Sequence, residues 1–486
     1  MARTKPVAVS GPPGDLVVDL DHTLIATDSL LEQWVALAFR QPLAALMLLV
    51  GLTGGRARFK AALAAAQPVD PGGLPFREEL LDFLRLQKRA GRRLHLVTAA
   101  DQTIAQAVAA HCDLFDTCEG SDGKTNLKGV HKASRLIERF PQGFGYAGDA
   151  RADLQVWARA ESIVIVGAGS DVARQARKLG KLVEVEFPPA RTTVGLWPRA
   201  LRLHQWAKNL LVFIPLMLSQ KYLEPQAVLL SVVAFVALGL VASATYLIND
   251  LSDLAVDRRH PTKQLRPLAA GHIRIEHACL SALLLLIFGC VLAGLTSPAL
   301  LAGLGAYAVV TLSYTFHLKR QTLLDVATLA ALYALRIMIG AATIGAAQSF
   351  WLLTFALLFF FSISLAKRYA EIFNQLAAAG PDDLKGRGYR TVDGPVVLGL
   401  GIATSVASVL IVVLYLMEEA FPSNIYAQPN WLWAAPFLLM IWVARLWLVA
   451  GRGELDEDPV AFAIKDRFSW LLAAPLALAF VLATLA

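Results

Sequence analysis

The stretch YLINDLSDLAVDRRHPTKQLRPLAAG, residues 246–271, decides how the second half of the chain is interpreted. It follows a long apolar run, residues 227–248, and it begins with four polar or acidic side chains on a shared spacing. These residues are Asn249, Asp250, Asp253 and Asp257. On a helix, their i, i+1, i+4, i+8 spacing places them on one face. Carboxylates gathered at a membrane surface repel one another, so the pattern predicts a cation that holds them.

The composition indicates a protein that crosses a membrane several times. The chain has 486 residues, of which 56% are hydrophobic, and its mean hydropathy is +0.52. Repeated long apolar runs at this hydropathy are typical of multi-span membrane proteins. About nine spans are predicted, centred on residues 210–219, 227–248, 278–296, 299–316, 323–345, 350–366, 395–417, 431–450 and 468–486.

Basic residues predict the orientation of these spans. Arginine and lysine concentrate in the loops that follow the second, fourth, sixth and eighth predicted spans. Loops rich in these residues usually remain in the cytoplasm. We therefore expect a protein of the bacterial inner membrane, with its N-terminal domain and active sites in the cytoplasm. An odd number of spans places the C-terminus outside.

The first part of the chain reads as an α/β domain. Short apolar runs such as DLVVDLD (15–21), RLHLVTAA (93–100) and FGYAGD (144–149) alternate with helical stretches. This alternation favours a parallel sheet covered by helices. The pair Pro188–Pro189 indicates a linker. The expected organisation is one domain over residues 1–187, a linker over 188–198 and a membrane domain over 199–486.

Polar residues at the predicted strand ends indicate phosphate chemistry. Asp19 can attack a phosphate, and Asp21 can give and take the proton of the leaving group. Thr98 can hydrogen-bond phosphoryl oxygens, and Lys128 supplies a positive charge. The Asp149–Asp153 pair suits Mg²⁺, which prefers hard oxygen ligands.

These four motifs, in this order, resemble the haloacid dehalogenase-like phosphatases. The pattern Asp19-Leu20-Asp21-His22-Thr23 is the phosphatase form of the first motif. The resemblance implies a Rossmann-like fold with a helical cap over about residues 25–92, and one Mg²⁺ bound by Asp19, Asp21, Asp149 and Asp153. The apolar segment 36–55 is expected to form a helix pair of the cap near the membrane surface.

The opening stretch predicts a metal–diphosphate site. Mg²⁺ typically bridges carboxylates and substrate phosphates, and the arginine and lysine side chains that follow can hold phosphate oxygens. The motif NDxxDxxxD after a membrane helix resembles the UbiA superfamily of intramembrane prenyltransferases. That resemblance implies an all-α polytopic bundle with one or more Mg²⁺ on Asn249, Asp250, Asp253 and Asp257.

The second acidic motif of that superfamily is reduced here to Asp325, and the sequence around it is basic. Together with QWAKN (205–209) and residues 260–271, this pattern resembles the decaprenyl-phosphate phosphoribosyltransferases within the superfamily. Arg336 lies inside an apolar span, where a charge is costly and usually functional. The implied substrate-binding residues are Lys208, Arg258, Lys263, Arg266, Tyr314, Lys319, Asp325, Arg336, Lys367, Arg368 and Tyr369.

The resemblance implies a two-step enzyme. Phosphoribosyl diphosphate would donate a phosphoribosyl group to a polyprenyl phosphate, and the N-terminal domain would then remove the 5-phosphate. Two alternatives remain open: prenyl transfer from a prenyl diphosphate to an aromatic or other small acceptor, and an N-terminal domain that is regulatory or acts on an unrelated phosphate ester. Nucleic acid is not expected as a partner, because no basic stripe is interleaved with aromatic residues. The four cysteines form no CxxC pair, so no zinc site is indicated.

Overall fold

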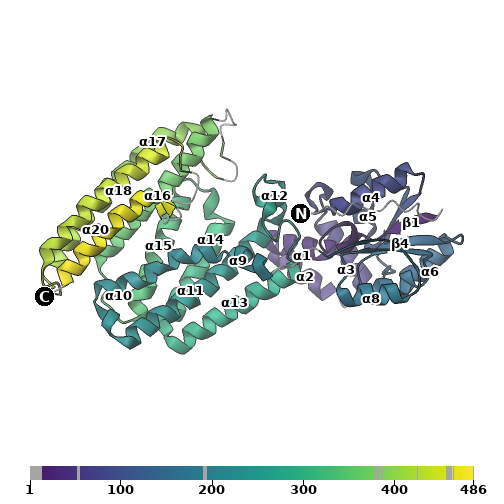
Figure 1. Ribbon diagram of the computed structural model, residues 1–486, viewed down its shortest axis with the longest axis horizontal. Helices are drawn as coiled ribbons and strands as arrows, with labels where there is room; N and C mark the ends of the chain where they lie inside the picture. The colour runs from purple at the N-terminus through teal and green to yellow at the C-terminus, as the bar shows by residue number, and fades with distance from the viewer. Residues whose placement is uncertain are drawn as a thin grey trace. The chain divides into compact units, whose positions relative to one another are not determined.

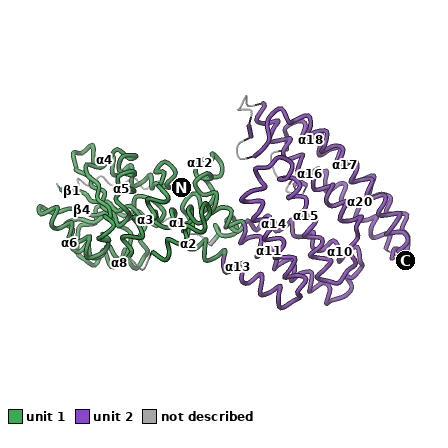
Figure 2. The backbone as a smooth tube through the Cα atoms, turned by 180° about the vertical axis from the view of Figure 1, so that it is seen from behind, with its two compact units in different colours: residues 1–201, 246–282 green, residues 202–245, 283–486 purple. Residues whose placement is uncertain are grey.

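The computed structural model describes residues 14–51, 55–189, 194–377, 383–384, 387–423, 425–455, 462–463 and 465–484. The chain divides into two compact units (Figure 2). The first unit comprises residues 1–201 and 246–282, and the second comprises residues 202–245 and 283–486. The segment that carries the acidic motif therefore belongs to the same compact unit as the N-terminal domain. A linear division of the chain near residues 188–198 does not anticipate this.

A six-stranded parallel sheet forms the centre of the first unit, in the order β3-β2-β1-β4-β5-β6. The strands are β1 (Asp15–Val18), β2 (Leu94–Asp101), β3 (Thr117–Ser121), β4 (Phe144–Gly148), β5 (Ser162–Val166) and β6 (Leu182–Phe187). β5 is apolar at almost every position because helices cover both faces of a parallel sheet. The predicted α/β fold is confirmed.

Two apolar clusters hold the helices on opposite faces of this sheet. Side chains alternate along β1, so Leu16 and Val18 enter one cluster and Val17 enters the other. The first cluster includes residues of α4 (Glu78–Arg89) and α5 (Gln102–Cys112). The second includes residues of α6 (Val130–Arg139), α7 (Leu154–Trp157) and α8 (Ser170–Lys178).

Three helices between β1 and β2 form a separate cap. They are α1 (Ser29–Arg40), α2 (Pro42–Val50) and α3 (Arg56–Ala66), and their buried residues make a small cluster of their own. The predicted cap over 25–92 also included α4, but the leucines of α4 pack with the sheet. The predicted helix pair over 36–55 corresponds to the end of α1 and to α2. Residues 52–54 lie outside the described residues.

The first unit also contains the end of α11 (Pro225–Ser252), α12 (Leu254–Arg259), the 3₁₀ turn η8 (Lys263–Leu265) and the start of α13 (Ile275–Thr296). The helix breaks at Asp253, whose φ and ψ are −93° and 6°. The backbone nevertheless keeps helical hydrogen bonds across the break, because Asp253 N donates to Asn249 O and Asp257 N donates to Asp253 O. The acidic residues therefore keep most of the predicted helical spacing.

Among the described residues, eight helices are long and apolar enough to cross a membrane. Besides α11 and α13 they are α14 (Pro298–Phe316), α15 (Leu324–Thr343), α16 (Phe350–Ala377), the run Thr391–Ala420 containing α17 (Gly394–Tyr415), the run Pro429–Gly451 containing α18 (Ala434–Gly451), and α20 (Arg467–Thr484). Eight of the nine predicted spans correspond to these helices. Helices α17, α18 and α20 run side by side (Figure 1).

The first predicted span, 210–219, is wrong as a single long helix. This region consists of the 3₁₀ run η6 (Leu203–Phe213) followed by the five-residue helix α10 (Ile214–Leu218). Pro215 at the start of α10 has no amide proton to donate. Placed end to end on one axis, at about 2.0 Å per residue for the 3₁₀ part and about 1.5 Å for the α part, the two pieces would rise roughly 30 Å. That rise is close to the thickness of a bilayer core.

Candidate functional sites

A polar cavity of about 330 Å³ lies where β1 and β4 end in the first unit, beneath the cap. Asp19 directly follows β1 and Asp149 directly follows β4, and these two strands are neighbours. The carboxyl ends of neighbouring parallel strands share one edge of a sheet, so both carboxylates line the same cavity. Asp21 and Asp153 line it as well.

A tight turn after β1 sets the direction of the first two acids. Asp19 Oδ1 accepts a hydrogen bond from Leu20 N at 2.8 Å, and His22 takes a left-handed conformation with φ of 57°. Asp21 Oδ1 accepts from Ser29 N, the first residue of α1, at 2.8 Å. Burial, reinforced by the nearby charge of Asp28, raises the pKa of Asp21 to about 7. A carboxyl with this pKa can carry a proton near neutral pH, as a general acid must.

Lys132 is the lysine that pairs with Asp19, and it was not predicted from the sequence. Its Nζ lies 2.9 Å from Asp19 Oδ2 and 3.0 Å from Tyr146 Oη, and the side chain is buried. The predicted cation, Lys128, lines the same cavity. Lys132 could have been found from its position one helical turn beyond Lys128, near the start of α6.

Thr98 is fully buried in β2, and its hydroxyl oxygen accepts a hydrogen bond from Ala100 N at 3.0 Å. Its contact with phosphoryl oxygens therefore stays a prediction. A further cation comes from the cap, where Lys60 Nζ donates to Ala99 O at 2.6 Å and to Asn126 Oδ1 at 3.0 Å. Burial lowers the pKa of Lys60. This lysine ties α3 to β2 and to the loop before α6.

The carboxylates of this site suit a hard divalent cation. Burial, together with the charges of Asp153 and Asp19, raises the pKa of Asp149 to about 8, and a bound cation would relieve that repulsion. Asp153 acts differently, because its carboxylate accepts from Asp149 N, Ala150 N and Tyr146 Oη. In the described residues, no group of three or more His, Cys, Asp or Glu side chains is arranged around a common metal position. Asp19, Asp21, Asp149 and Asp153 all line the cavity, and their role as Mg²⁺ ligands stays a prediction.

The acidic motif after α11 converges on one arginine. Arg266 Nη1 donates to Asp250 Oδ1 at 3.1 Å and also to Asp257 Oδ2. Asp250 and Asp257 are both buried, and burial raises the pKa of Asp257 although Arg266 opposes the shift. Lys263 Nζ is 4.0 Å from Asp257 Oδ1. Arg266 and Lys263, which were predicted to hold substrate phosphates, thus pair with acidic residues of the same segment, and the Mg²⁺ site predicted on Asn249, Asp250, Asp253 and Asp257 stays a prediction.

Arg258 was predicted to bind substrate, and in the structure it pairs with a residue of the cap. Its guanidinium forms an ion pair with Glu32 of the cap helix α1. Arg258 therefore has a protein partner in place of the predicted substrate phosphate.

In the second unit, Asp325 is neutralised by protein groups. The carboxylate is completely buried at the start of α15, where it accepts from Arg368 Nε and from Tyr389 Oη, each at 2.7 Å. Arg368 is 1% exposed and also pairs with Glu371. Asp325 and Arg368, which were both predicted to bind substrate, thus form an ion pair with each other inside the helical bundle.

Arg336 is buried in α15 and its donors are used within the protein. Nε donates to Asn209 Oδ1 at 3.1 Å, Nη1 to Leu332 O at 2.7 Å and Nη2 to Tyr307 Oη at 3.0 Å. The guanidinium also lies 5.3 Å from the ring centre of Tyr333. These contacts satisfy a charge inside an apolar helix without requiring a substrate.

The other predicted residues of the second unit lie in η6, α14, α16 and a turn between helices. Lys208 in η6 lies over the ring of Tyr333, with Nζ 5.8 Å from the ring centre. Tyr314 Oη accepts from Arg387 Nη1 at 2.9 Å, and Tyr369 packs near Trp447. Lys319 lies in the turn η9 (Leu318–Arg320), and Lys367 lies in α16.

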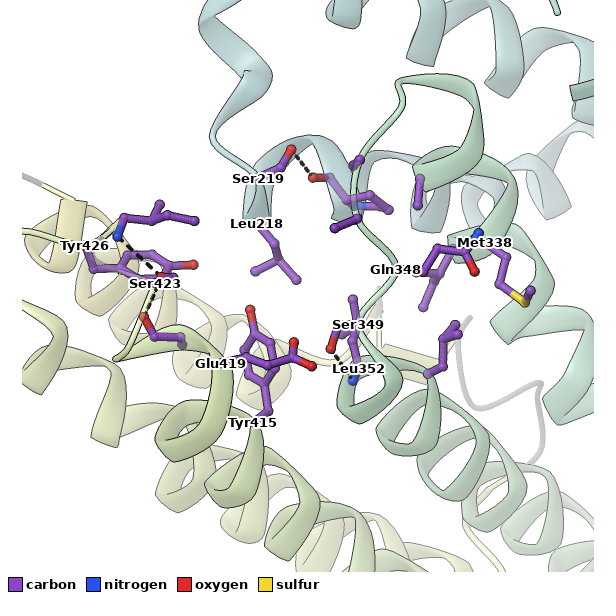
Figure 3. Close-up of a pocket in the computed structure, with 18 residues that line it drawn as sticks. Leu218, Ser219, Met338, Gln348, Ser349, Leu352, Tyr415, Glu419, Ser423 and Tyr426 are labelled. Atoms are coloured by element: carbon purple, nitrogen blue, oxygen red, sulfur yellow. Dashed lines mark hydrogen bonds between the residues drawn. The ribbon is translucent and has the colours of Figure 1, made fainter. Parts of the chain in front are cut away.

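Two adjoining cavities open among the helices of the second unit. The larger, about 670 Å³, is lined almost entirely by apolar side chains from η6, α10, α16, α17, α18 and α20. The smaller, about 270 Å³, shares Leu218, Leu352, Tyr415 and Tyr426 with it. Figure 3 shows the oxygens of Tyr415 and Glu419 pointing toward this smaller cavity. The larger cavity is thus an apolar groove, and the smaller one is also mostly apolar, with a few polar side chains such as Ser219, Ser349 and Glu419 in its lining.

The family models match both halves of the chain. Residues 210–472 match the UbiA prenyltransferase family, and residues 16–158 match the haloacid dehalogenase-like hydrolases. The chain belongs to the UbiA prenyltransferase family and carries a haloacid dehalogenase-like domain at its N-terminus. It is an integral membrane protein.

Three relatives are similar over long stretches. The uncharacterised protein y4nM of Sinorhizobium fredii is 42% identical over 96% of this chain and 90% of its own length. The nodulation protein NoeC of Azorhizobium caulinodans is 31% identical over 58% of this chain and 91% of its own length. The decaprenyl-phosphate phosphoribosyltransferase of Mycobacterium tuberculosis is 30% identical over 60% of this chain and 94% of its own length.

Proposed function

We propose that this protein transfers a 5-phosphoribosyl group from phosphoribosyl diphosphate to a polyprenyl phosphate and then removes the 5-phosphate with its N-terminal domain. The observation that carries the first step is the neutralised Asp325. An enzyme that holds a prenyl diphosphate between two metal clusters needs a second group of ionised carboxylates. Here the corresponding carboxylate is buried against Arg368 and Tyr389.

The apolar groove of the second unit supports a lipid acceptor. Its volume of about 670 Å³ and its apolar lining suit an isoprenoid chain, which offers no hydrogen-bonding groups. The similarity to a decaprenyl-phosphate phosphoribosyltransferase over most of that relative's length points to the same class of acceptor.

In the transfer step, a phosphate oxygen of the lipid attacks the anomeric carbon of the donor, and diphosphate leaves. Asn249, Asp250, Asp253 and Asp257 would hold Mg²⁺, which would supply charge stabilisation to the departing diphosphate. Arg266 and Lys263 add positive charge beside Asp257. These cations lower the negative charge of the acidic segment so that an anionic substrate can approach it.

In the second step, Asp19 attacks the phosphorus of the 5-phosphate, and the ribose oxygen leaves with a proton from Asp21. Asp21 then takes a proton from water, which hydrolyses the aspartyl phosphate and returns Asp19. Mg²⁺ on Asp19 and Asp149 would neutralise the phosphoryl oxygens. Lys132 pairs with Asp19 Oδ2 and would add positive charge beside the phosphate.

Prenyl transfer to an aromatic or other small acceptor is the second candidate, because the matching family is described by prenyl transfer. We further propose that the protein lies in the bacterial inner membrane, with its N-terminal domain in the cytoplasm and its C-terminus outside.

The test is product analysis with purified full-length protein, Mg²⁺, decaprenyl phosphate and phosphoribosyl diphosphate labelled in the ribose. We expect label in the extracted lipid, and its loss when Asp250 and Asp253 are both changed to Asn. The Asp19→Asn variant should accumulate the phosphorylated lipid alone. No label in the lipid, under conditions where a prenyl diphosphate and an aromatic acceptor react, would favour the second candidate.

A further inference from the structure

The ion pair between Arg258 and Glu32 is one of the least exposed in the first unit. The side chain of Arg258 is 7% exposed and that of Glu32 is 14% exposed. The guanidinium meets both carboxylate oxygens, with Nη1 at 2.8 Å and Nη2 at 2.5 Å. It also donates to Gly73 O at 3.2 Å and to Ala269 O at 3.0 Å. A planar guanidinium with four acceptors is fixed in position, because its donors form a rigid fork.

The same segment also packs on both connectors of the cap. We define the first connector as residues 25–28 and the second connector as residues 67–77. A bridge between Ile25 and Phe76 joins them. Gly271 has a φ of +70°, and a Cβ at this position would lie only 2.9 Å from Ala26 Cβ. Arg258 Nη1 donates to Gly73 O in the second connector. The segment after the acidic motif therefore contacts both places where the cap would hinge.

Helix α1 connects this contact to the phosphatase cavity. Its N-cap is Asp28, and the amide of its first residue, Ser29, holds Asp21 Oδ1 at 2.8 Å. Glu32 lies one turn further along, and its amide donates to Asp28 O. Because a hydrogen-bonded helical turn moves as one piece, fixing Glu32 also fixes the amide that orients Asp21.

We propose that Arg258 is a positioning residue of the phosphatase: through Glu32 and the first turn of α1, it holds the cap in the place where Ser29 N orients Asp21. The inference rests on the proposed phosphatase activity of the N-terminal domain. It assigns to the segment after the acidic motif of the membrane domain a second role, which is to complete the neighbouring catalytic domain.

The test compares Arg258→Met, Arg258→Lys, Glu32→Gln and the double variant Arg258→Met/Glu32→Gln in the full-length protein, with ribose 5-phosphate as substrate. We expect Arg258→Met and Glu32→Gln each to lower kcat roughly ten- to a hundredfold, because a small displacement of a catalytic group is costly. KM should change much less. The double variant should be no worse than either single variant, since one interaction is lost in all three. Arg258→Lys should be intermediate, because lysine keeps the charge but not the fork.

The matched control is Arg259→Met, which breaks the neighbouring ion pair of Arg259 and Asp70. The side chain of Arg259 is 61% exposed and that of Asp70 is 57% exposed. Such an exposed pair contributes little, so kcat should stay at the wild-type value. Wild-type kcat in Arg258→Met, or additive losses in the double variant, would overturn the inference.

Hydrogen–deuterium exchange separates this inference from the function on which it rests. The amides of residues 32–37 in α1 should exchange faster in Arg258→Met than in the wild type or in Arg259→Met. If the wild type hydrolyses no phosphate ester, the proposed phosphatase activity is rejected. Faster exchange in Arg258→Met would then support only the structural role of Arg258, which is to hold the cap in place through Glu32. Unchanged exchange in Arg258→Met would reject that structural role as well.

Discussion

At the scale of single residues, the phosphatase cavity shows how burial prepares ordinary side chains for catalysis. Asp21 and Asp149 differ from surface carboxyls only in their surroundings, yet their pKa values rise to about 7 and about 8. Desolvation is the main cause in both cases, because a charged carboxylate is less favourable away from water. The raised pKa values suit the roles proposed for these residues, which are proton donor for Asp21 and metal ligand for Asp149.

Lys132, and not Lys128, should be the cation that matters most for phosphoryl transfer. Its Nζ is 2.9 Å from Asp19 and its side chain is buried, so its charge acts at low dielectric. We expect Lys132→Met to lower kcat on ribose 5-phosphate by about 10² to 10³, and Lys128→Met to lower it less. Equal losses in the two variants, or a larger loss for Lys128→Met, would assign the role to Lys128.

Magnesium affinity of the phosphatase site should depend on pH through Asp149. Below about pH 8 this carboxyl holds a proton in the metal-free protein, and the metal must displace it. We expect affinity to rise by about tenfold per pH unit from pH 6 to 8 and to level off above. Isothermal titration calorimetry would measure the Mg²⁺ affinity at each pH. The Asp149→Asn variant is the control, because the pH dependence that comes from Asp149 should be absent from it. A flat profile would contradict the prediction.

The raised pKa of Asp149 also predicts how the stability of the folded, metal-free protein depends on pH. The folded-state pKa of about 8 lies above the unfolded-state value of about 3.9. Proton binding therefore favours the folded, metal-free protein at low pH, and this contribution is lost as the pH rises through about 8. Mg²⁺ should restore stability above that pH.

At the scale of elements, the buried pair of Asp325 and Arg368 joins α15 to α16. Changing Arg368 to Met leaves a carboxylate buried without its partner, which costs about 3–5 kcal/mol. We expect a lower thermal midpoint in detergent for this variant. The double variant Asp325→Asn/Arg368→Met should recover part of the loss, because the isolated charge is gone.

The exposed pair of Arg390 and Asp383 provides the control for this prediction. Arg390→Met should shift the midpoint little, because exposed ion pairs contribute only about 0–1 kcal/mol. Similar shifts for Arg390→Met and Arg368→Met would show that burial does not decide the effect.

At the scale of the whole molecule, the orientation in the membrane is open to direct measurement. The predicted topology places Gln348, between α15 and α16, outside the cell and Arg320, between α14 and α15, inside. With the four native cysteines changed to Ser, we expect a membrane-impermeant maleimide to label Gln348→Cys in intact spheroplasts. Arg320→Cys should react only after permeabilisation. The opposite pattern would reverse the predicted topology.

The sequence by itself determined the two classes of fold and which carboxylates gather at each candidate site. Alternating apolar runs specify a parallel sheet because both of its faces must be buried, and long apolar helices specify membrane spans because backbone groups need partners in lipid. Strand ends placed Asp19 and Asp149 together, and helical spacing placed Asp250 near Asp257. All of these depend on local periodicity, which is visible in the sequence.

Only the tertiary structure decided which cations meet which carboxylates. Lys132 reaches Asp19 across the sheet edge, Arg368 neutralises Asp325 between two helices, and Arg258 pairs with Glu32 across 226 residues of sequence. The broken segment 203–218 was likewise invisible to hydropathy, which measures composition and not backbone conformation. Long side chains can reach many partners, so their choice depends on packing at a distance that no local pattern records.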